Sequence, residues 1–494
     1  MEQRRLHQPR IGILIVAYNA ALTLQRVLDR IPVSFRQRTT KVFICDDHSH
    51  DSTYLVGLGY KQLTPELPIE VIRNAQNLGY GGNQKLGYRL AIEHDLDIVV
   101  MLHGDGQYAP ECLEDIVAPL ERGEADAVLG SRMMEKGAAR RGGMPLYKFL
   151  GNRVLTTFEN TMLGTSLTEF HSGYRAYSVR ALRSIPFEQN SDDFDFDTEI
   201  IIQFHSAGLR ITETPIPTYY GDEICYVNGM KYAKDVCLDV IRYRLGRLGF
   251  SSGGLVSPAE ELYQLKDDPS SSHSRIIRWL TQMPPSRVLD LGCAGGYVAE
   301  LASRYGHRVT GIDVIESAGV RGRVAQFVQA DLNDGIPPSV GGNYDIVLAA
   351  DVLEHVRSPE RLLDQIDRVM VRGGVLLASI PNFGHWYPRL RAVTGTFDYD
   401  ERGILDRTHL RFFTRRSFLR MVRSNGYDVL RSEVTGLPVS TLVANRRLSS
   451  ILGRADRALV AIRPTLFGYQ FLYELRPRMR EMATARPDAL AESG

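Results

Sequence analysis

Short apolar runs, each followed by a polar or glycine-rich segment, recur along the first half of the chain. They occupy residues 11–17, 42–45, 70–73 and 98–102. Continuous apolar runs of this length are typical of strands that are buried on both faces. Because helix-like segments separate the runs, the pattern predicts βα units in series and a doubly wound parallel sheet.

The second half repeats this pattern after a break. Residues 251–274 are rich in Gly, Ser and Pro, which interrupts the periodicity and predicts a domain boundary. Apolar runs resume at 287–291 and 309–312, and the aromatic stretch 465–475 predicts a last strand or a docking segment. We therefore expect an α/β domain at 1–250, a linker at 251–275, a second α/β domain at 276–480 and a disordered tail at 481–494.

Length and composition limit the possible classes of protein. A chain of 494 residues exceeds one ordinary core. With 44% hydrophobic residues, 24% charged residues and a net charge of +1, nothing indicates a nucleic-acid partner. No signal-peptide core and no apolar window of about 18 residues is found, so we expect a cytoplasmic protein. The five cysteines include no C-x-x-C pair, which argues against disulfides and a zinc site.

Polar residues follow the predicted strands of the first half. Asp105 lies between two glycines just after the run 98–102, and we interpret it as a divalent-metal ligand near a bound phosphate. An Asp-Gly turn without a ligand is the alternative. Adjacent carboxylates at 46 and 47 favour a hydrogen-bond-donating ligand such as a nucleoside, although Asp47 or Asp51 could instead cap the next helix. The glycines at 79, 81 and 82 permit close approach of a ligand to the backbone.

Six blocks in the first half carry a family resemblance. They are AYN, CDDHSHDST, NLGYGGNQKLG, HGDGQYAPE, GSR and HSGYRAYS, spread over residues 9–245. In this order they resemble family 2 glycosyltransferases of the GT-A fold, in particular the dolichyl-phosphate mannose synthase branch. The resemblance implies inverting transfer from a nucleotide-diphosphate sugar, with Mg²⁺ or Mn²⁺, to a polyprenyl-phosphate or glycan acceptor. It implies a donor site formed by Asn19, Asp46, Asp47, Gly79, Arg132 and Arg141, and metal ligands Asp105, Gln107 and His103.

One departure from the family pattern affects this interpretation. The usual D-x-D is His103-Gly104-Asp105 here. Because histidine also ligates Mn²⁺, we expect activity to be retained, while the metal preference stays open. The alternative is that the first half is a non-catalytic module that binds a nucleotide sugar or a lipid phosphate.

The acceptor decides whether a general base is needed, because a hydroxyl requires one and a phosphate oxygen does not. The acidic run 192–199 offers Asp197 first and Glu199 second, although such runs are commonly solvated. Residues 140–153 are interpreted as a mobile acceptor loop or a solvated connection. Residues 230–250 have helical spacing and basic residues. They fit peripheral contact at the inner face of a membrane, or a helix packed on its own domain.

The second half has a different ligand signature. The glycine turn 292–296 leads into a helix, and Asp313 follows about 20 residues later, where it could accept hydrogen bonds from a ribose. On these residues alone NAD is an alternative. The blocks VLDLGCAGG, GIDV, QADLND, YDIVLAADVLEHV, RGGVLLASIPN and DRTHLRFFT, over about 260–435, resemble class I S-adenosylmethionine-dependent methyltransferases with a Rossmann-like fold. The resemblance implies cofactor contacts from Asp290, Gly292, Gly295, Asp313, Asp331 and Asp351, with Ala294 where the family often has glycine.

Methyl transfer needs alignment, and a base when the acceptor is a hydroxyl. His355 is our first candidate, and His409 is interpreted as structural. Asp351, Glu354 and His355 would share one face of a helix, where they could also bind a metal. The resulting hypothesis is a bifunctional enzyme of glycan assembly that adds a sugar and O-methylates a compound of the same pathway.

Overall fold

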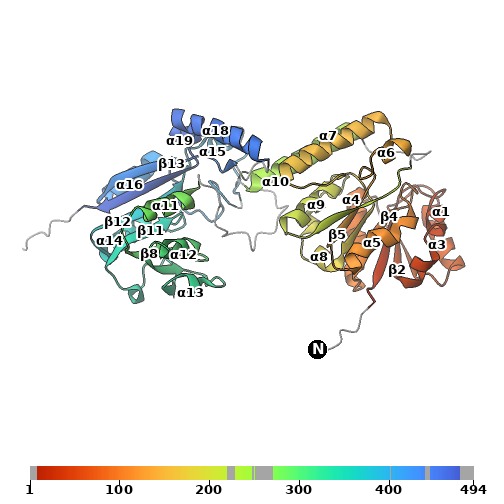
Figure 1. Ribbon diagram of the computed structural model, residues 1–494, viewed down its shortest axis with the longest axis horizontal. Coiled ribbons are helices and arrows are strands. Elements are labelled where there is room, and N and C mark those ends of the chain that lie inside the picture. The colour runs from red at the N-terminus through yellow and green to blue at the C-terminus, as the bar shows by residue number, and fades with distance from the viewer. Residues whose placement is uncertain are drawn as a thin grey trace, which may run out of the picture. The chain divides into compact units, whose positions relative to one another are not determined.

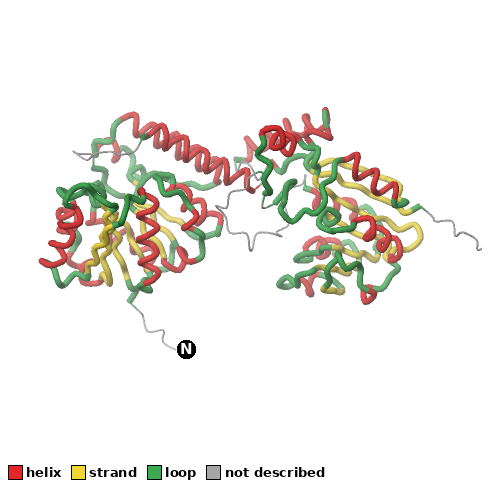
Figure 2. The backbone as a smooth tube through the Cα atoms, turned by 180° about the vertical axis from the view of Figure 1, so that it is seen from behind, coloured by secondary structure: helices red, strands yellow, loops and turns green. Residues whose placement is uncertain are grey.

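The computed structural model describes residues 8–219, 228–247, 250, 271–400, 402–439 and 445–478 (Figure 1). The chain divides into two compact units, formed mainly by residues 1–247 and by residues 260–440 with 447–494. Each unit contains one seven-stranded sheet, and Figure 2 shows the strands of each sheet among covering helices. Most of the expected linker at 251–275, and the whole expected tail at 481–494, lie outside the described residues.

The first sheet has the strand order β3-β2-β1-β4-β6-β5-β7. Its strands are β1 Ile11–Ala17, β2 Thr39–Asp46, β3 Ile69–Arg73, β4 Ile98–His103, β5 Ala127–Ser131, β6 Arg175–Ser178 and β7 Ile211–Pro215. The first four pair in parallel, as the apolar runs predict. The prediction of a wholly parallel sheet is wrong at β6, which is antiparallel to both β4 and β5. This four-residue strand contains Arg175 and has no apolar run to mark it.

Helices cover both faces of this sheet. They are α1 Leu24–Asp29, α2 Val33–Arg38, α3 Thr53–Leu63, α4 Gly79–Glu93, α5 Leu113–Glu121, α6 Ala138–Arg141, α7 Leu146–Leu163, α8 Val179–Arg183, α9 Phe196–Ser206 and α10 Gly229–Arg247. Ile13 and Ile15 pack in one core with α1 and α5, while Leu14 and Val16 pack in the other with α4 and α9. Both faces of β1 are therefore buried, which explains its uninterrupted apolar run.

Helices α6, α7 and α10 contain most of residues 140–153 and 230–250, for which the sequence left alternatives open. Val240 and Tyr243 of α10 are buried in a core that also contains Leu163 of α7, so α10 is packed on its own domain. Residues 140–153, expected as a loop or connection, form the end of α6, a turn and the start of α7. Helix α7 turns polar side chains inward and leaves four large apolar side chains exposed: Leu146, Tyr147, Leu150 and Val154.

The second sheet has the order β10-β9-β8-β11-β12-β14-β13. Its strands are β8 Arg287–Leu291, β9 Arg308–Asp313, β10 Gln326–Gln329, β11 Tyr344–Ala350, β12 Met370–Pro381, β13 Tyr427–Thr435 and β14 Gln470–Pro477. The predicted last strand is β14, and it inserts antiparallel between β12 and β13. The other neighbouring pairs are parallel.

The helices of the second unit differ from the sequence expectation at two places. They are α11 Ser272–Thr281, α12 Tyr297–Ser303, α13 Val320–Arg323, α14 Pro359–Val369, α15 Trp386–Thr394, α16 Arg415–Ser424, α18 Arg446–Ile462 and α19 Pro464–Phe467. Helix α11 begins within the expected linker. The helix expected to carry Asp351, Glu354 and His355 is absent, because this segment is a turn that begins with Asp351 at φ 55°. Among the described helices, none has the length and apolar character needed to cross a bilayer.

Candidate functional sites

Three acidic residues follow β2 at the carboxyl edge of the first sheet, and their environments differ. Asp46 is fully buried, and one of its oxygens accepts hydrogen bonds from the backbone N–H and the hydroxyl of Ser49. Its other oxygen has no hydrogen-bond partner among the described residues and lies 3.6 Å from Arg73 Nε. Asp46 Oδ2 is therefore paired with the Arg73 guanidinium but accepts no hydrogen bond within the described residues.

Asp47 and Asp51 act as caps. Asp47 accepts hydrogen bonds from the backbone N–H groups of Leu78 (2.8 Å) and Gly79 (3.0 Å) at the start of α4. Asp51 accepts from the N–H of Thr53 (2.9 Å) at the start of α3 and from that of Ala21 (3.0 Å). Asp51 thus contacts the start of the next helix, as the capping alternative proposed, whereas Asp47 holds the start of α4 instead. The nucleoside role of Asp47 stays a prediction.

Asn19 ties the loop after β1 to the loop after β2. It adopts a left-handed conformation with φ 49°, which asparagine tolerates better than most residues. Its side-chain oxygen accepts from His50 N–H at 2.9 Å, and its own N–H donates to Ser49 Oγ at 2.9 Å. Asn19 therefore positions the loop beside Asp46.

The glycines that open α4 serve contacts within the protein. A Cβ at Gly79 would clash with the carbonyl oxygen of Asp192, and one at Gly81 with that of Ser191. The Gly81 N–H also donates to Asp192 O at 2.8 Å. The 191–192 backbone thus approaches Gly79 and Gly81 closely, and the approach of a ligand to these glycines stays a prediction.

The predicted metal ligands separate into two environments. Asp105 is exposed, and one oxygen accepts from Gln107 N–H at 2.9 Å; no other hydrogen bond reaches this carboxylate within the described residues. His103 contacts two tyrosines, with Nε2 3.3 Å from the Tyr80 hydroxyl and its ring centroid 4.8 Å from that of Tyr108. Burial lowers the pKa of His103, so the imidazole is neutral near pH 7. Asp105 thus has an oxygen available to a cation, while His103 is engaged in packing.

Asp197 is the partner of a buried cation. Its carboxylate accepts from the Tyr80 hydroxyl and from Gln84 Nε2, both at 3.1 Å, and lies 3.4 Å from Arg175 Nη2. Arg175 is fully buried and donates to the carbonyl oxygens of Phe170, Ser172 and Asp197, each at 2.7 Å. Tyr80 links this ion pair to His103. The blocks quoted above contain Tyr80, Gln84 and Arg175, but their spacing does not indicate that they meet.

Glu199 belongs to a different cluster. Its carboxylate accepts from Ser191 N–H at 2.5 Å and groups with those of Asp195 and Asp239, with one oxygen of each within 4.8 Å of the others. Burial, together with the neighbouring carboxylates, raises the pKa of Glu199 to about 7 and that of Asp239 to about 8. The structure therefore separates our two candidate bases.

The two arginines expected at the donor phosphates also differ. Arg132 is buried and forms an ion pair with the fully buried Glu169, to which its backbone N–H donates at 2.7 Å. Its charge is thus already balanced within the protein. Arg141 is exposed at the end of α6, and no carboxylate pairs with it among the described residues. Of the two, Arg141 is the one available to a phosphate.

Four acidic residues lie at or just beyond the carboxyl ends of adjacent parallel strands in the second sheet. These are Asp331, Asp313, Asp290 and Asp351, on β10, β9, β8 and β11 in spatial order. Asp313 accepts from the N–H groups of Ala294 (2.8 Å) and Ile315 (3.0 Å), while Asp331 is exposed. Asp290 is buried without a side-chain hydrogen bond in the described part of the chain, and burial with nearby Asp313 raises its pKa to about 7.

The turn after β8 requires a special backbone. Gly292 has φ 66° and Ala294 has φ 46°, so both are left-handed, and the alanine carries a strain of about 1 kcal/mol that glycine would avoid. A Cβ at Gly295 would lie 2.7 Å from the ring of Tyr297. The turn places backbone N–H groups beside Asp313, the arrangement that the predicted cofactor site requires.

Asp351 is held from two strands. Ser379 Oγ on β12 donates to one oxygen at 2.6 Å, and Gln470 Nε2 on β14 donates to the other at 2.8 Å. Gln470 lies 119 residues further along the chain, and the sequence offers no signal for this contact.

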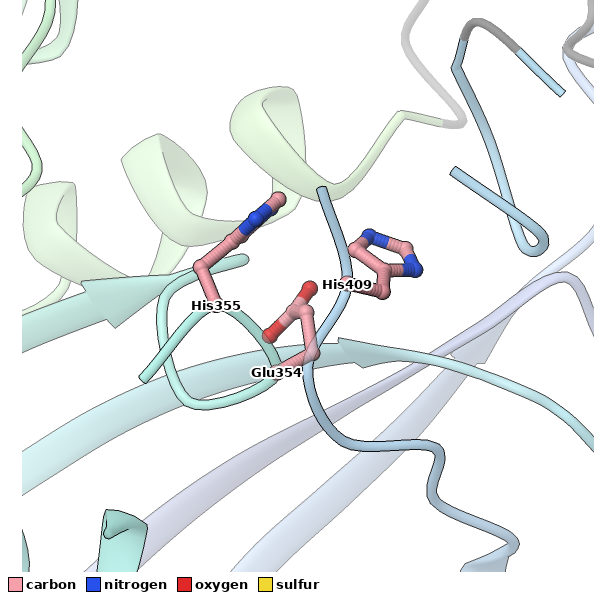
Figure 3. A group of neighbouring side chains, drawn as sticks. All are labelled: Glu354, His355 and His409. Carbon is pink, nitrogen blue, oxygen red and sulfur yellow. The ribbon is translucent and has the colours of Figure 1, made fainter. Parts of the chain in front are cut away.

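Three side chains beyond β11 meet in a cluster, which Figure 3 shows with the carboxylate of Glu354 between two histidines. The sequence predicted that Asp351 would join Glu354 and His355, and His409 was interpreted as structural. In the structure His409 is the third member of the group instead of Asp351, and its ring centroid lies 4.7 Å from that of His355. Burial, reinforced by Asp351, raises the pKa of Glu354 well above its usual range, and burial lowers that of His409.

Comparison with known proteins agrees with this division. The family model "Glycosyl transferase family 2" matches residues 12–185, and the model "Methyltransferase domain" matches residues 264–432. An undecaprenyl-phosphate mannosyltransferase of Micrococcus luteus is 30% identical over 213 residues, covering 42% of this chain and 82% of that protein. A UDP-N-acetylglucosamine–dolichyl-phosphate N-acetylglucosaminyltransferase of Methanococcus voltae is 29% identical, covering 42% and 86%. A ubiquinone biosynthesis O-methyltransferase of Psychrobacter arcticus is 30% identical over 171 residues, covering 32% and 63%.

Proposed function

Because the chain belongs to glycosyltransferase family 2 through its first half and carries a class I methyltransferase domain in its second, we propose a bifunctional enzyme of glycan assembly. One half transfers a sugar from a nucleotide-diphosphate donor to a polyprenyl phosphate, and the other methylates a hydroxyl in the same pathway. The observation that carries the proposal is that acidic residues gather at the carboxyl edge of each sheet, where α/β proteins bind nucleotides.

In the first half, Asp46 Oδ2 pairs with Arg73 and can still accept a hydrogen bond from the nucleoside, and Asn19 holds the adjacent loop. Asp105 suits a Mg²⁺ or Mn²⁺ ion bound mainly by the donor's phosphates, because it offers one exposed carboxylate, as such sites commonly do. That ion would stabilise the charge on the leaving diphosphate. Arg141 is exposed and without a carboxylate partner among the described residues, which supports it as the phosphate-binding arginine, whereas Arg132 pairs with Glu169.

A polyprenyl phosphate acceptor fits the surface of α7 and the names of the relatives above. The exposed fractions of Leu146, Tyr147, Leu150 and Val154 run from 52% to 72%. Arg140, Arg141 and Arg153 are exposed nearby, and no acidic residue occurs between 136 and 158. Apolar side chains flanked by cations favour contact with an anionic membrane surface. A phosphate nucleophile needs no base, so Asp197 acts as the partner of Arg175.

In the second half, S-adenosylmethionine fits the residues present. Asp313 is oriented by two backbone N–H groups and keeps lone pairs for ribose hydroxyls, and buried Asp290 accepts no side-chain hydrogen bond from any described residue. Asp351 is fixed by Ser379 and Gln470 beside the expected sulfonium. The bound group would supply the methyl, and His355 stands where it can orient an acceptor. The methyltransferase family match supports this cofactor over NAD.

The test is product analysis with the full chain. Undecaprenyl phosphate in anionic vesicles, a panel of labelled nucleotide sugars, Mn²⁺ and S-adenosylmethionine are incubated together, and products are identified by mass spectrometry. Asp105→Asn should abolish the lipid-linked sugar and leave S-adenosylmethionine binding intact, while Asp313→Asn should do the reverse. Asp192→Asn, at an exposed carboxylate, is the matched control. A wild-type chain that binds a donor yet transfers no sugar would favour the non-catalytic module instead.

A further inference from the structure

The cluster of Glu354, His355 and His409 has the composition of a metal site. One ligand atom from each side chain lies within 4.8 Å of the other two, and the segments that supply them are more than 50 residues apart (Figure 3). The two segments are joined by backbone hydrogen bonds, because the Glu354 carbonyl accepts from the N–H groups of Leu410 (2.8 Å) and Arg411 (2.9 Å). The cluster is therefore pre-organised by the fold.

Both imidazoles are oriented through Nδ1. His355 Nδ1 lies 3.3 Å from the Thr408 carbonyl oxygen and 3.2 Å from the Thr408 hydroxyl, whose own proton is donated to Asp406 at 2.6 Å. His409 Nδ1 lies 3.2 Å from the carbonyl oxygen of Ile404. A carbonyl only accepts, so Nδ1 donates its proton there and Nε2 keeps a lone pair. Metal-binding histidines are commonly held in this way, with the second nitrogen donating to a backbone carbonyl.

Glu354 is the observation that points to a ligand. Its side chain is 1% exposed, and neither carboxylate oxygen has a hydrogen-bond partner within the described residues. A buried carboxylate without donors is costly unless a cation or a proton neutralises it. Asp351 is not a member of this group of ligand atoms, and Ser379 and Gln470 each donate a hydrogen bond to one of its oxygens.

The donor set selects the class of ion. Two imidazoles and one carboxylate suit divalent transition metals such as Zn²⁺, Fe²⁺ or Mn²⁺, whereas Mg²⁺ and Ca²⁺ prefer oxygen ligands alone. Three protein ligands leave coordination positions open, and the half-buried His355 gives the cluster a side that a small molecule can reach.

We propose that Glu354, His355 and His409 bind one divalent transition-metal ion, and that this ion holds the oxygen of the methyl acceptor. The role, though not the site, rests on the proposed methyltransferase function. In the reaction the acceptor oxygen forms a bond to the methyl carbon as the carbon–sulfur bond breaks. The hydroxyl proton passes to water, and the positively charged sulfonium becomes a neutral thioether.

The experiment uses the full chain with Asp105→Asn, so that the predicted ion of the first half does not contribute. Protein treated with chelator and dialysed is titrated with Co²⁺, followed by its visible absorption spectrum and by metal analysis. We expect one tightly bound Co²⁺ with nitrogen ligation, and at least about 10-fold weaker binding after Glu354→Gln or His409→Gln. Glu360→Gln, an exposed charge on α14, is the control and should bind like the parent. Circular dichroism verifies the fold of each variant.

Two results would overturn the site: a parent protein without stoichiometric Co²⁺, or unchanged binding in a folded Glu354→Gln variant. The first does not depend on any substitution within the cluster, so a cluster variant that fails to fold leaves the test decisive. Calorimetry with S-adenosylmethionine on the same samples separates the two proposals. If the protein binds S-adenosylmethionine but no metal, only the metal site is refuted. If it binds metal but no S-adenosylmethionine, the metal site is supported and the methyltransferase function is refuted.

Discussion

Replacing Asp197 by asparagine tests whether this carboxylate serves mainly to balance Arg175. The hydrogen bonds at Asp197 should survive, because Tyr80 and Gln84 can each exchange donor and acceptor roles with the new amide. The charge is lost, however, and Arg175 is fully buried. Removing one partner of a buried ion pair costs about 3–5 kcal/mol, and the three carbonyl acceptors that Arg175 retains favour the lower end.

Thermal unfolding of the full chain measures this cost in the transition of the first unit. About 3 kcal/mol corresponds to a fall in Tm of about 6–12 °C for a unit of this size. Asp95→Asn is the control, because this carboxylate is 76% exposed, its partner Arg183 is 49% exposed, and the pair should contribute less than about 1 kcal/mol. In an Arg175→Met background, Asp197→Asn should cost much less. If Asp197→Asn lowers Tm no more than the control does, our account of Arg175 is wrong.

Three further predictions concern other parts of the molecule. The folded-state pKa of Asp239, about 8, lies above the ordinary value of 3.8, so its contribution to stability is complete below about pH 4 and is lost as the pH rises through 8. Asp239→Asn should therefore flatten the decline of Tm between pH 5 and 9 (about 1.4 kcal/mol per pKa unit), and an unchanged slope would contradict the assignment. Gln470→Leu removes a hydrogen-bond donor from Asp351 and should weaken S-adenosylmethionine binding in calorimetry without affecting sugar-nucleotide binding. If the variant binds S-adenosylmethionine as tightly as the wild type does, Gln470 does not contribute to the site. Leu150→Glu with Val154→Glu should reduce co-sedimentation with anionic vesicles at unchanged Tm, whereas the same changes at exposed Leu55 and Leu63 on α3 should not.

The local sequence pattern was sufficient to predict features that depend on residues close to one another along the chain. The apolar runs at β1, β2 and β4 mark strands covered on both faces, and a strand of this kind has to be apolar at every position. The polar residues that end these strands are equally visible, because parallel strands joined by helices all finish at one edge. The two α/β units, and the edges that carry Asp46, Asp105, Asp290 and Asp313, follow from such local features.

Contacts between distant segments could not be predicted in the same way. Whether an aspartate holds the start of a helix, as Asp47 does, or leaves an oxygen without a hydrogen bond, as Asp46 does, depends on which N–H groups the fold brings to it. The insertion of β14 places Gln470 on Asp351, and a turn in place of a helix sets His409 beside Glu354. Residue type and spacing are properties of a segment, whereas these pairings depend on the packing of whole layers. The chemistry available at each edge was therefore predictable, but which side chains remain free to perform it was settled by long-range packing.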